Sequence, residues 1–354
     1  MKIISIVGAR PQFIKLGPLS RELRKFHNEL IIHTGQHFDT EMSDLFFRDL
    51  EIPEPNYNLN VSGGSHGQQT SQMLSSIESV LIKESPNLVV IFGDTNSTLA
   101  GSLAASKLCI PCLHIEAGLR SFNRTMPEEI NRIVADHTSD FLFAPTQTAM
   151  VNLEKEGLLS KSFCTGDIMV DSIAWGSEKA KGSTIIESLN LENKAFSLLT
   201  LHRPYNVDDS SKLSLIINKL GHLNTNIVFP IHPRTKSIIE KYSIDIPSNF
   251  IITKPVGYLD FIKLQTASVR IITDSGGIQK EAFLLRKPCI TLRPETEWVE
   301  TVNEGWNILL DISTPNLVET IESFSPSGSP KQVFGTEVAK EMVSIINSKI
   351  LRCC

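Results

Sequence analysis

The sequence has no long apolar segment and no excess of positive charge. The amino-terminal stretch MKIISIVGARPQ contains an apolar run of about five residues, shorter than the roughly 7–15-residue core of a secretion signal. No stretch approaches the ~20 apolar residues of a membrane span. Lys and Arg number 34 against 39 Asp and Glu, a net charge of −5, which offers no basic surface for nucleic acid or an anionic membrane. We therefore expect a cytoplasmic protein that binds neither.

Cysteine is scarce, and the common cofactor motifs are absent. Six cysteines in 354 residues suit a reducing compartment without a disulfide framework. Cys109 and Cys112 have C-x-x-C spacing, but no second pair accompanies them, so a structural role is favoured over a redox or zinc site. Cys353 and Cys354 are expected in a frayed tail. Without H-E-x-x-H, G-x-G-x-x-G or G-x-x-x-x-G-K-[ST], the sequence predicts no metal and no cofactor.

Short apolar runs alternate with amphipathic segments along the chain. In the first half, strands are predicted at KIISIV, ELIIHT, NLVVIFG, CLHIEA and DFLFAPT, and helices over 11–26, 68–84, 96–108, 127–139 and 146–157. A second series of strands is predicted at SLLTLH, NIVFPIH, NFIITK, VRIITD, PCITLR and NILLD. This alternation predicts parallel sheets covered on both faces, so we expect an α/β protein with two Rossmann-like domains.

The boundary between the two series is predicted near residue 165. Residues 1–165 then form an amino-terminal domain and residues 166–335 a carboxyl-terminal domain. The Pro, Ser and Gly cluster over 324–335 predicts an exposed loop leading into a last helix, within 336–354. By analogy with other two-Rossmann proteins, we expect this helix to cross back and pack on the first domain.

Polar residues follow the predicted strands directly. Ligands of open parallel sheets bind outside the carboxyl ends of the strands, which makes these residues candidates for a site. They are Gly8–Arg10, Gly35–His37, Gly93–Thr95, Glu116, His202 with Arg203, His232–Arg234 and Asp274–Gly277. Because they come from both halves, we expect a site in a cleft between the domains.

The segment TDSGGIQKEA (273–282) has the pattern of an anion site. Ser275, Gly276 and Gly277 lie where a strand turns into a helix, so backbone N–H groups and the positive helix end can hold a phosphate. Glu281 follows within the helix, near enough to accept from ribose hydroxyls. The alternative is a glycine pair that only lets the helix pack closely on the strand. Cations able to meet a diphosphate are Arg10, Lys15, His202, Arg203 and Arg234.

Three carboxylates, Asp94, Glu116 and Glu128, are candidates for proton transfer. Carboxylates at neighbouring strand and helix starts can share a proton and act as acid and base. Glu128 and Glu129 both follow a proline at a helix start, where an acidic residue also stabilises the helix dipole. We therefore assign Glu128 to the site and Glu129 to structure. His114 and His137 are interpreted as core or interface histidines, whereas His202 ends a strand beside an arginine and could assist a leaving phosphate.

Eight ordered motifs resemble those of one family, the non-hydrolysing UDP-N-acetylglucosamine 2-epimerases. They are GARPQFIK (8–15), TGQH (34–37), GDTNST (93–98), HIEAGLR (114–120), PEEINR (127–132), LHR (201–203), HPRT (232–235) and TDSGGIQKEA (273–282). The resemblance spans nearly the whole chain. It implies a GT-B-like fold, a cytoplasmic homodimer, and a role in making surface polysaccharide precursors.

The resemblance also implies roles for individual residues. It makes Asp94, Glu116 and Glu128 the catalytic carboxylates and His202 the catalytic histidine. The substrate ligands it implies are Arg10, Lys15, His232, Arg234, the diphosphate loop Ser275, Gly276 and Gly277, the ribose ligand Glu281, and Phe261 beside the uracil. It further implies C2 inversion through elimination of UDP and its re-addition, in a cleft that closes against water.

Two segments depart from the family pattern. HRPYN (202–206) replaces H-R-R-E-N, which predicts loss of the allosteric substrate site of bacterial members. TEWVE (296–300) replaces T-E-R-P-E and, with GGSHGQQTSQM (63–73), resembles the branch acting on modified sugars such as UDP-2,3-diacetamido-glucuronate or a 6-deoxy analogue. The remaining alternatives are a GT-B glycosyltransferase, a hydrolysing 2-epimerase and a nucleotide-sugar sensor.

Overall fold

The computed structural model describes residues 1–36 and 47–350, and it divides the chain into two compact units. The first unit comprises residues 1–172 and 332–354, and the second comprises residues 173–331. His37, Cys353, Cys354 and the end of the predicted 336–354 segment lie outside the described residues. No helix in the described ranges has both the length and the apolar content needed to cross a bilayer.

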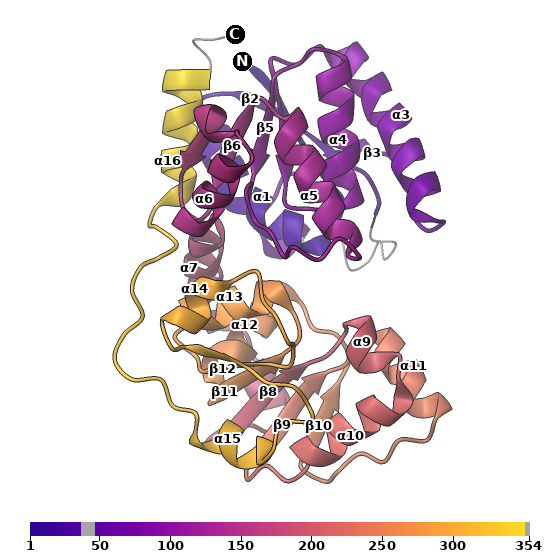
Figure 1. The fold of residues 1–354 in the computed structure, drawn as a ribbon, viewed down its shortest axis with the longest axis vertical. Coiled ribbons are helices and arrows are strands. Elements are labelled where there is room, and N and C mark those ends of the chain that lie inside the picture. Colours follow the sequence, from indigo (N-terminus) through magenta and orange to yellow (C-terminus); the bar gives the residue numbers. More distant parts are fainter. Residues whose placement is uncertain (37–46, 351–354) are drawn as a thin grey trace. The chain divides into compact units, whose positions relative to one another are not determined.

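The first unit is built on a parallel sheet of seven strands (Figure 1). The order across the sheet is β3-β2-β1-β4-β5-β6-β7, which is a Rossmann-type order. The strands are β1 (Lys2–Val7), β2 (Asn28–His33), β3 (Tyr57–Asn58), β4 (Leu88–Phe92), β5 (Cys112–Ile115), β6 (Phe141–Ala144) and β7 (Ser162–Cys164). The central strand β4 is buried along its whole length, as expected for a sheet with helices on both faces.

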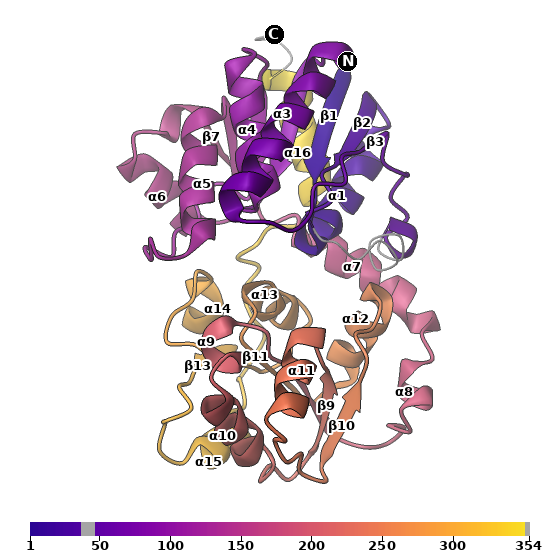
Figure 2. The same cartoon turned by 90° about the vertical axis from the view of Figure 1, so that its right-hand side faces the viewer.

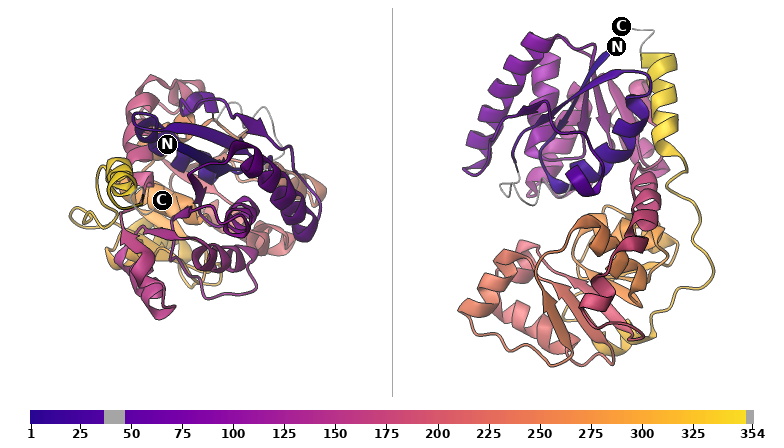
Figure 3. Two further views of the ribbon diagram at one scale, coloured as in Figure 1. Left: turned by 90° about the horizontal axis from the view of Figure 1, so that it is seen from above. Right: turned by 180° about the vertical axis from the view of Figure 1, so that it is seen from behind.

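The helices of the first unit cover both faces of its sheet. They are α1 (Arg10–Leu23), α3 (His66–Glu84), α4 (Asn96–Lys107), α5 (Pro127–Thr138), α6 (Gln147–Lys155), the short η1 (Leu159–Lys161), and α16 (Val338–Ile345) with its π-helical continuation η3 (Ile346–Ile350). Helices α3, α4 and α5 pack on one face through a shared apolar cluster. Helices α1 and α16 lie on the opposite face (Figure 3, right).

The last helix belongs to the first unit because it packs against α1. Its buried side chains include Val338, Met342 and Val343. The Asp171 carboxylate accepts a hydrogen bond from the Ala339 backbone N–H at 2.6 Å, which fixes the start of α16. Gly166 and Gly335 both have left-handed backbones, and a side chain on Gly166 would meet the Phe334 carbonyl oxygen at 2.6 Å. The returning segment therefore runs in close contact with residues 165–167.

The second unit contains a parallel sheet of six strands in the order β10-β9-β8-β11-β12-β13 (Figure 2). The strands are β8 (Phe196–Thr200), β9 (Asn226–Pro230), β10 (Phe250–Thr253), β11 (Arg270–Thr273), β12 (Cys289–Thr291) and β13 (Asn307–Leu309). The two sheets confirm the predicted α/β class with two Rossmann-like halves.

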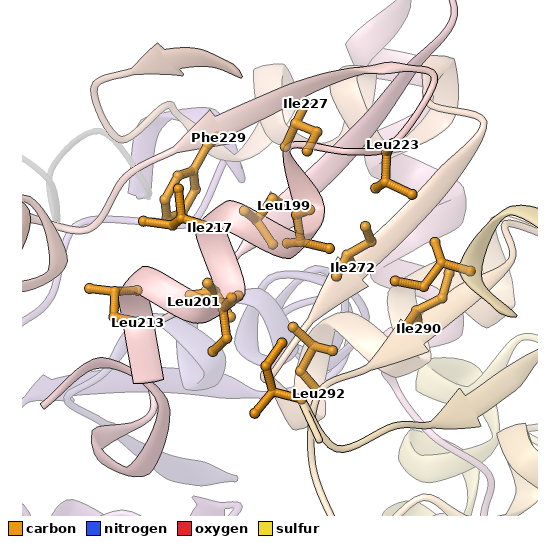
Figure 4. Close-up of a cluster of buried hydrophobic side chains, with 14 of the residues drawn as sticks. Leu199, Leu201, Leu213, Ile217, Leu223, Ile227, Phe229, Ile272, Ile290 and Leu292 are labelled. Atoms are coloured by element: carbon orange, nitrogen blue, oxygen red, sulfur yellow. The ribbon is translucent and has the colours of Figure 1, made fainter. Parts of the chain in front are cut away.

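Helices cover both faces of the second sheet as well. They are η2 (Ala180–Gly182), α8 (Ile185–Ser188), α9 (Pro204–Val207), α10 (Ser210–Leu220), α11 (Pro233–Lys241), α12 (Tyr258–Ala267), α13 (Gly276–Leu284), α14 (Val299–Asn303) and α15 (Leu317–Ser323). Helix α7 (Met169–Lys179) contains the boundary between the units. On one face, Leu213 and Ile217 of α10 pack against strand residues such as Leu199 and Phe229 (Figure 4). Helices α12 and α13 pack on the other face.

Candidate active site

Adjacent strands bring the candidate residues of the first unit together. In the sheet, β4 pairs with β1 on one side and with β5 on the other. The carboxyl end of β1 leads into Gly8–Arg10, that of β4 into Gly93 and Asp94, and that of β5 into Glu116. Because parallel strands end at one edge, these three turns lie side by side.

Lys15 and Glu116 form a buried ion pair at this edge. The Lys15 ammonium contacts the Glu116 carboxylate, and their side chains are only 8% and 10% exposed. Glu116 has a left-handed backbone with φ of 73°, which is rare for a residue with a side chain. A side chain on Gly93 would lie 3.1 Å from the Glu116 carboxylate and 3.2 Å from Lys15 Nζ. The left-handed φ of 62° and these close distances favour glycine at position 93.

Asp94 is held by α5. The Arg132 guanidinium contacts the Asp94 carboxylate, and Asn131 Nδ2 donates to the Asp94 carbonyl oxygen at 2.9 Å. The Asp94 side chain remains 32% exposed, so a ligand can reach it. Glu128 is half-buried and lies one turn before Asn131 and Arg132. Positions three and four apart share a helix face, which places Glu128 on the side of α5 that faces Asp94.

Glu129 organises the loop between β5 and α5. Its buried carboxylate accepts hydrogen bonds from the backbone N–H groups of Ser121 and Phe122, both at 2.9 Å. It also pairs with Arg132 at 2.8 Å, so Arg132 lies between Glu129 and Asp94. Phe122 has a left-handed φ of 58° and is 75% exposed. The loop is thus fixed through the same arginine that holds a candidate catalytic residue.

Gln12 connects two of these turns and was not singled out from the sequence. Its side-chain oxygen accepts from the backbone N–H groups of Gly8 and Ala9 at 2.8 and 3.1 Å. Its nitrogen donates to the Phe92 carbonyl oxygen at 2.9 Å. The only sequence signal was its place inside the GARPQFIK motif. Arg10 is the first residue of α1 and is half-buried beside these contacts.

In the second unit, Asp274 orients His202. The His202 Nδ1 atom lies 3.1 Å from an Asp274 carboxylate oxygen, and Asp274 is fully buried. The same carboxylate accepts from the Arg203 backbone N–H at 3.0 Å and from Asn206 Nδ2 at 3.2 Å. Burial acts to raise the pKa of Asp274, but the contacts with His202, Arg203 and Asn206 outweigh it and lower the pKa. An ionised Asp274 fixes the His202 ring and leaves Nε2 for proton transfer.

The start of α13 has the form expected for an anion site. Ser275 is the N-cap residue, and its backbone N–H donates to Thr273 Oγ1 at 2.9 Å. A side chain on Gly276 would meet a Glu297 carboxylate oxygen at 2.2 Å, whereas the space around Gly277 is open. The first glycine is needed for packing, and the second leaves the backbone accessible to a ligand.

Two predicted nucleotide ligands lie deeper in the second unit. Glu281 is 5% exposed and accepts a hydrogen bond from the buried Gln265 Nε2 at 2.6 Å. Phe261 is also buried and belongs to an apolar cluster with Phe196, Leu264 and others. The structure therefore places both side chains inside the unit, with Gln265 as a neighbour of Glu281 that the sequence did not indicate.

Two predicted substrate ligands lie near the start of α11. His232 is the N-cap residue, and its Nδ1 accepts from the Arg234 backbone N–H at 3.2 Å. Burial, with the nearby charges of His202 and Arg234, lowers the pKa of His232. Arg234 pairs with Asp208, and both side chains are exposed. His232 thus lies close to His202, while Arg234 contacts a carboxylate.

The segments HRPYN and TEWVE, which differ from the family pattern, meet at the carboxyl edge of the second sheet. Burial raises the pKa of Tyr205 to about 12, with Arg293, Asp274 and Glu297 among the charged neighbours. Arg293 and Glu297 are buried and lie 3.0 Å apart. Lys280 lies over the Trp298 ring at 3.8 Å from its centroid. Tyr205 and Glu297 thus share one neighbourhood, next to the anion site at α13.

Thiols and carboxylates are the side chains that could hold a metal ion or undergo redox reactions. No cluster of three His, Cys, Asp or Glu side chains with metal-ligand geometry occurs within residues 1–36 and 47–350. Cys109, Cys112, Cys164 and Cys289 are free thiols. Burial raises the pKa of Cys112 to about 12, so this thiol stays protonated.

Sequence comparison identifies relatives over most of the chain. The profile of the family described as UDP-N-acetylglucosamine 2-epimerase matches residues 21–346. A Methanococcus maripaludis protein named UDP-N-acetylglucosamine 2-epimerase homolog is 53% identical over 333 residues, covering 92% of this chain and 93% of its own. A Pseudomonas aeruginosa protein named UDP-2,3-diacetamido-2,3-dideoxy-D-glucuronate 2-epimerase is 48% identical over 328 residues, covering 90% and 91%.

Structure comparison also finds UDP-N-acetylglucosamine 2-epimerases. The crystal structure of Methanocaldococcus jannaschii UDP-GlcNAc 2-epimerase in complex with UDP-GlcNAc and UDP matches with a TM-score of 0.91 at 42% identity. The match covers 98% of this chain and 99% of that one. It confirms the predicted fold class.

Proposed function

Because the chain belongs to the UDP-N-acetylglucosamine 2-epimerase family, we propose that it inverts C2 of UDP-N-acetylglucosamine without hydrolysis. One observation carries the proposal: two carboxylates, Asp94 and Glu116, end neighbouring strands and each is paired with a buried cation. Such pairing keeps carboxylates ionised and in place, as proton transfer requires.

The reaction must begin with the leaving group. The C2 proton of a pyranose has no adjacent carbonyl to acidify it, so the anomeric C–O bond opens first and its electron pair leaves with UDP. The resulting oxocarbenium-like centre at C1 acidifies the C2 proton. Carboxylates beside the sugar stabilise this positive charge.

The second step removes the C2 proton. One of Asp94, Glu116 and Glu128 accepts it, and the C2–H electron pair forms the C1–C2 double bond of a 2-acetamidoglucal. In the re-addition step that follows, a second acid protonates C2 from the opposite face, and a phosphate oxygen of UDP re-forms the bond to C1. Atoms and charge balance without a cofactor, and UDP must stay bound throughout.

The second unit supplies the groups for UDP. The open backbone at Gly277 and the amino-terminal end of α13 bind the diphosphate. His202, oriented by Asp274, assists the departing phosphate with a proton. Arg10, Lys15 and Arg234 contribute positive charge. The lowered pKa of His232 makes its ring a neutral hydrogen-bonding group for the phosphates. Glu281 binds the ribose, and Phe261 borders the uracil.

A modified sugar is the second candidate substrate. The 48% identity to the Pseudomonas aeruginosa diacetamido-glucuronate enzyme favours it. The two substrates differ at C3 and C6 but share the 2-acetamido group and the UDP leaving group, so the mechanism is unchanged. A 6-deoxy analogue would use the same steps.

Incubation in D₂O tests the proposal. The protein is mixed with UDP-N-acetylglucosamine, and separately with UDP-2,3-diacetamido-glucuronate, and the products are followed by NMR. Deuterium at C2 of an intact nucleotide sugar is expected with the physiological substrate. Free sugar would instead indicate hydrolysis, and absence of exchange with both would indicate a transferase or a sensor.

Amide variants test the carboxylates. Asp94→Asn, Glu116→Gln and Glu128→Gln each lose a proton acceptor, so C2 exchange should fall by about 10²–10⁴-fold while UDP binding persists. The exposed Glu154→Gln on α6 is the matched control and should exchange at the wild-type rate. Wild-type turnover in all three site variants would rule out the assignment.

We also propose that the enzyme is a cytoplasmic homodimer. The free cysteines within the described residues favour a reducing compartment, and the family resemblance favours the dimer. Sedimentation across a range of protein concentrations tests the assembly, and a monomer at all concentrations would refute it.

A further inference from the structure

His114 is a fully buried histidine that the proposed mechanism does not use. It lies in β5, two residues before Glu116. Both of its ring nitrogens are within hydrogen-bonding distance of an oxygen. Nδ1 is 2.7 Å from Asp136 Oδ1, and Nε2 is 2.7 Å from the Gly93 carbonyl oxygen.

Neither of these two oxygens can donate a proton. The Gly93 oxygen is a backbone carbonyl, which only accepts. The other Asp136 oxygen lies 2.7 Å from Arg120 Nη1 and 3.1 Å from the Gly118 backbone nitrogen, which are both donors. Burial acts to raise the pKa of Asp136, but His114 and Arg120 outweigh it and lower the pKa. An ionised Asp136 leaves both hydrogen bonds for His114 to donate, so the ring is an imidazolium.

The charged groups around the ring are mixed in sign. Asp136 on α5 and Arg120 after β5 lie at the ring, and Arg120 pairs in turn with Glu156 at 2.7 Å. Lys161 donates to the Asp136 carbonyl oxygen at 2.9 Å and has Asp140 as a second acidic neighbour. The cations His114, Arg120 and Lys161 thus face the carboxylates Asp136, Glu156 and Asp140. A buried cation is retained when it is paired and hydrogen-bonded in this way.

Gly93 connects this cation to two of the candidate carboxylates, Asp94 and Glu116. It precedes Asp94 directly, and its N–H donates to the Ile115 carbonyl oxygen at 3.0 Å. Its left-handed turn lies close to the Lys15–Glu116 pair, since a side chain there would come within 3.1 Å of Glu116 and 3.2 Å of Lys15. A donor on the Gly93 carbonyl oxygen therefore fixes the orientation of the Gly93–Asp94 peptide relative to Glu116.

We propose that His114, held as an imidazolium by Asp136, is a positioning residue that sets the placement of Asp94 relative to Glu116. The catalytic meaning of this placement rests on the proposed function, but the protonation state and the peptide orientation do not. No contact between His114 and the substrate is implied. Its effect reaches the reaction through Gly93.

Nitrogen NMR of the full-length protein, labelled with ¹⁵N-histidine, tests the protonation state. Both His114 ring nitrogens should carry protons across the neutral pH range, and the His114→Gln spectrum identifies the resonance by its loss. A single protonated nitrogen at neutral pH would overturn the proposal. This measurement needs no substrate, so it stands even if the protein proves to have another activity.

Two substitutions separate the two hydrogen bonds. In His114→Gln, the amide nitrogen takes the place of Nε2 and can still donate to the Gly93 oxygen. In His114→Asn, the amide nitrogen takes the place of Nδ1 and can reach only Asp136. If positioning through Gly93 matters, the Asn variant should lose about 10²-fold in kcat, as expected for a misplacement of about 1 Å, with KM little changed. The Gln variant should lose much less.

A purely structural role predicts the reverse or no difference, because Asn keeps the buried partner of Asp136. Equal kcat losses in both variants, or losses that follow their unfolding temperatures, would overturn the proposal. His137→Gln is the matched control, since His137 is exposed and reaches Glu156 at the edge of the same network. It should retain wild-type kcat. If an unstable Asn variant cannot be assayed, a crystal structure of the Gln variant with an unmoved Gly93–Asp94 peptide is expected, and a rotated one contradicts the proposal.

Discussion

Two residues of the candidate site and its adjoining loop have unfavourable backbone conformations. Glu116 and Phe122 both have left-handed φ values, 73° and 58°, although neither is glycine. Each such residue costs on the order of 1–3 kcal/mol and persists only where its surroundings hold it. The Lys15 pair holds Glu116, and the Glu129 carboxylate holds the Phe122 backbone. Two of the twelve left-handed non-glycine residues in the described part of the chain thus belong to the candidate site and its adjoining loop.

Replacing Phe122 by Asn should stabilise the protein. Asn tolerates the left-handed region, so Phe122→Asn should relieve about 1 kcal/mol of strain, and Phe122 is too exposed for much packing to be lost. Urea unfolding followed by circular dichroism measures the change. Phe122→Ala, which keeps the strain, is the control and should show no gain. A lower free energy of unfolding for the Asn variant would contradict the prediction.

Asp274 should make stability depend on acid pH. Its pKa in the folded protein is lowered, so the unfolded chain binds the proton more tightly. The stabilisation is complete above the ordinary aspartate pKa and is lost as pH falls through the folded value. Asp274→Asn should lose about 1–3 kcal/mol at pH 7, because an NH2 donor replaces one of the two oxygens that accept from buried donors. It should also show a flatter pH dependence below pH ~4.

Urea titrations from neutral to acid pH check this prediction. The exposed Asp245→Asn is the control and should keep the wild-type profile. An unchanged acid limb in the Asp274 variant would show that this carboxylate does not contribute to the pH dependence.

Local sequence signals located most of the long elements. The predicted helices over 96–108 and 127–139 are confirmed as Asn96–Lys107 and Pro127–Thr138, because Thr95 caps the first and Pro127 starts the second. The strand at KIISIV is confirmed as Lys2–Val7. The last helix, predicted within 336–354, becomes π-helical from Ile346 onward, a change that apolar periodicity does not report.

Partners in the site could not be read from the sequence. Strand ends indicated Asp94 and His202, but Arg132 and Asp274 hold them through contacts between residues 38 and 72 positions apart. The pairing of Arg234 with Asp208 and the burial of Phe261 likewise depend on tertiary packing. Periodicity reports which face of an element is apolar, and it contains no information about which polar side chains meet.

Each unit has its own core, so the two should unfold separately. All three tryptophans, Trp175, Trp298 and Trp306, lie in the second unit, whereas circular dichroism reports on both. Met342→Ala in the first unit should cost about 2–5 kcal/mol and shift part of the dichroism transition, while leaving the tryptophan transition in place. Leu213→Ala in the second unit should shift the tryptophan transition.

Guanidinium chloride unfolding with both probes measures this difference. Exposed Glu341→Ala is the control for Met342→Ala and should shift neither signal. Coincident shifts of both probes in both core variants would mean that the chain unfolds as one cooperative body.

The return of the last helix to α1 has a consequence for biosynthesis. Domains fold as they emerge from the ribosome, usually the amino-terminal one first. Here the first unit needs residues 332–354, which are translated only after the whole second unit. The second unit, which is continuous in sequence, is complete before them. On the ribosome, the nascent chain therefore carries the apolar flank of α1 uncovered until the residues of α16 have been synthesised.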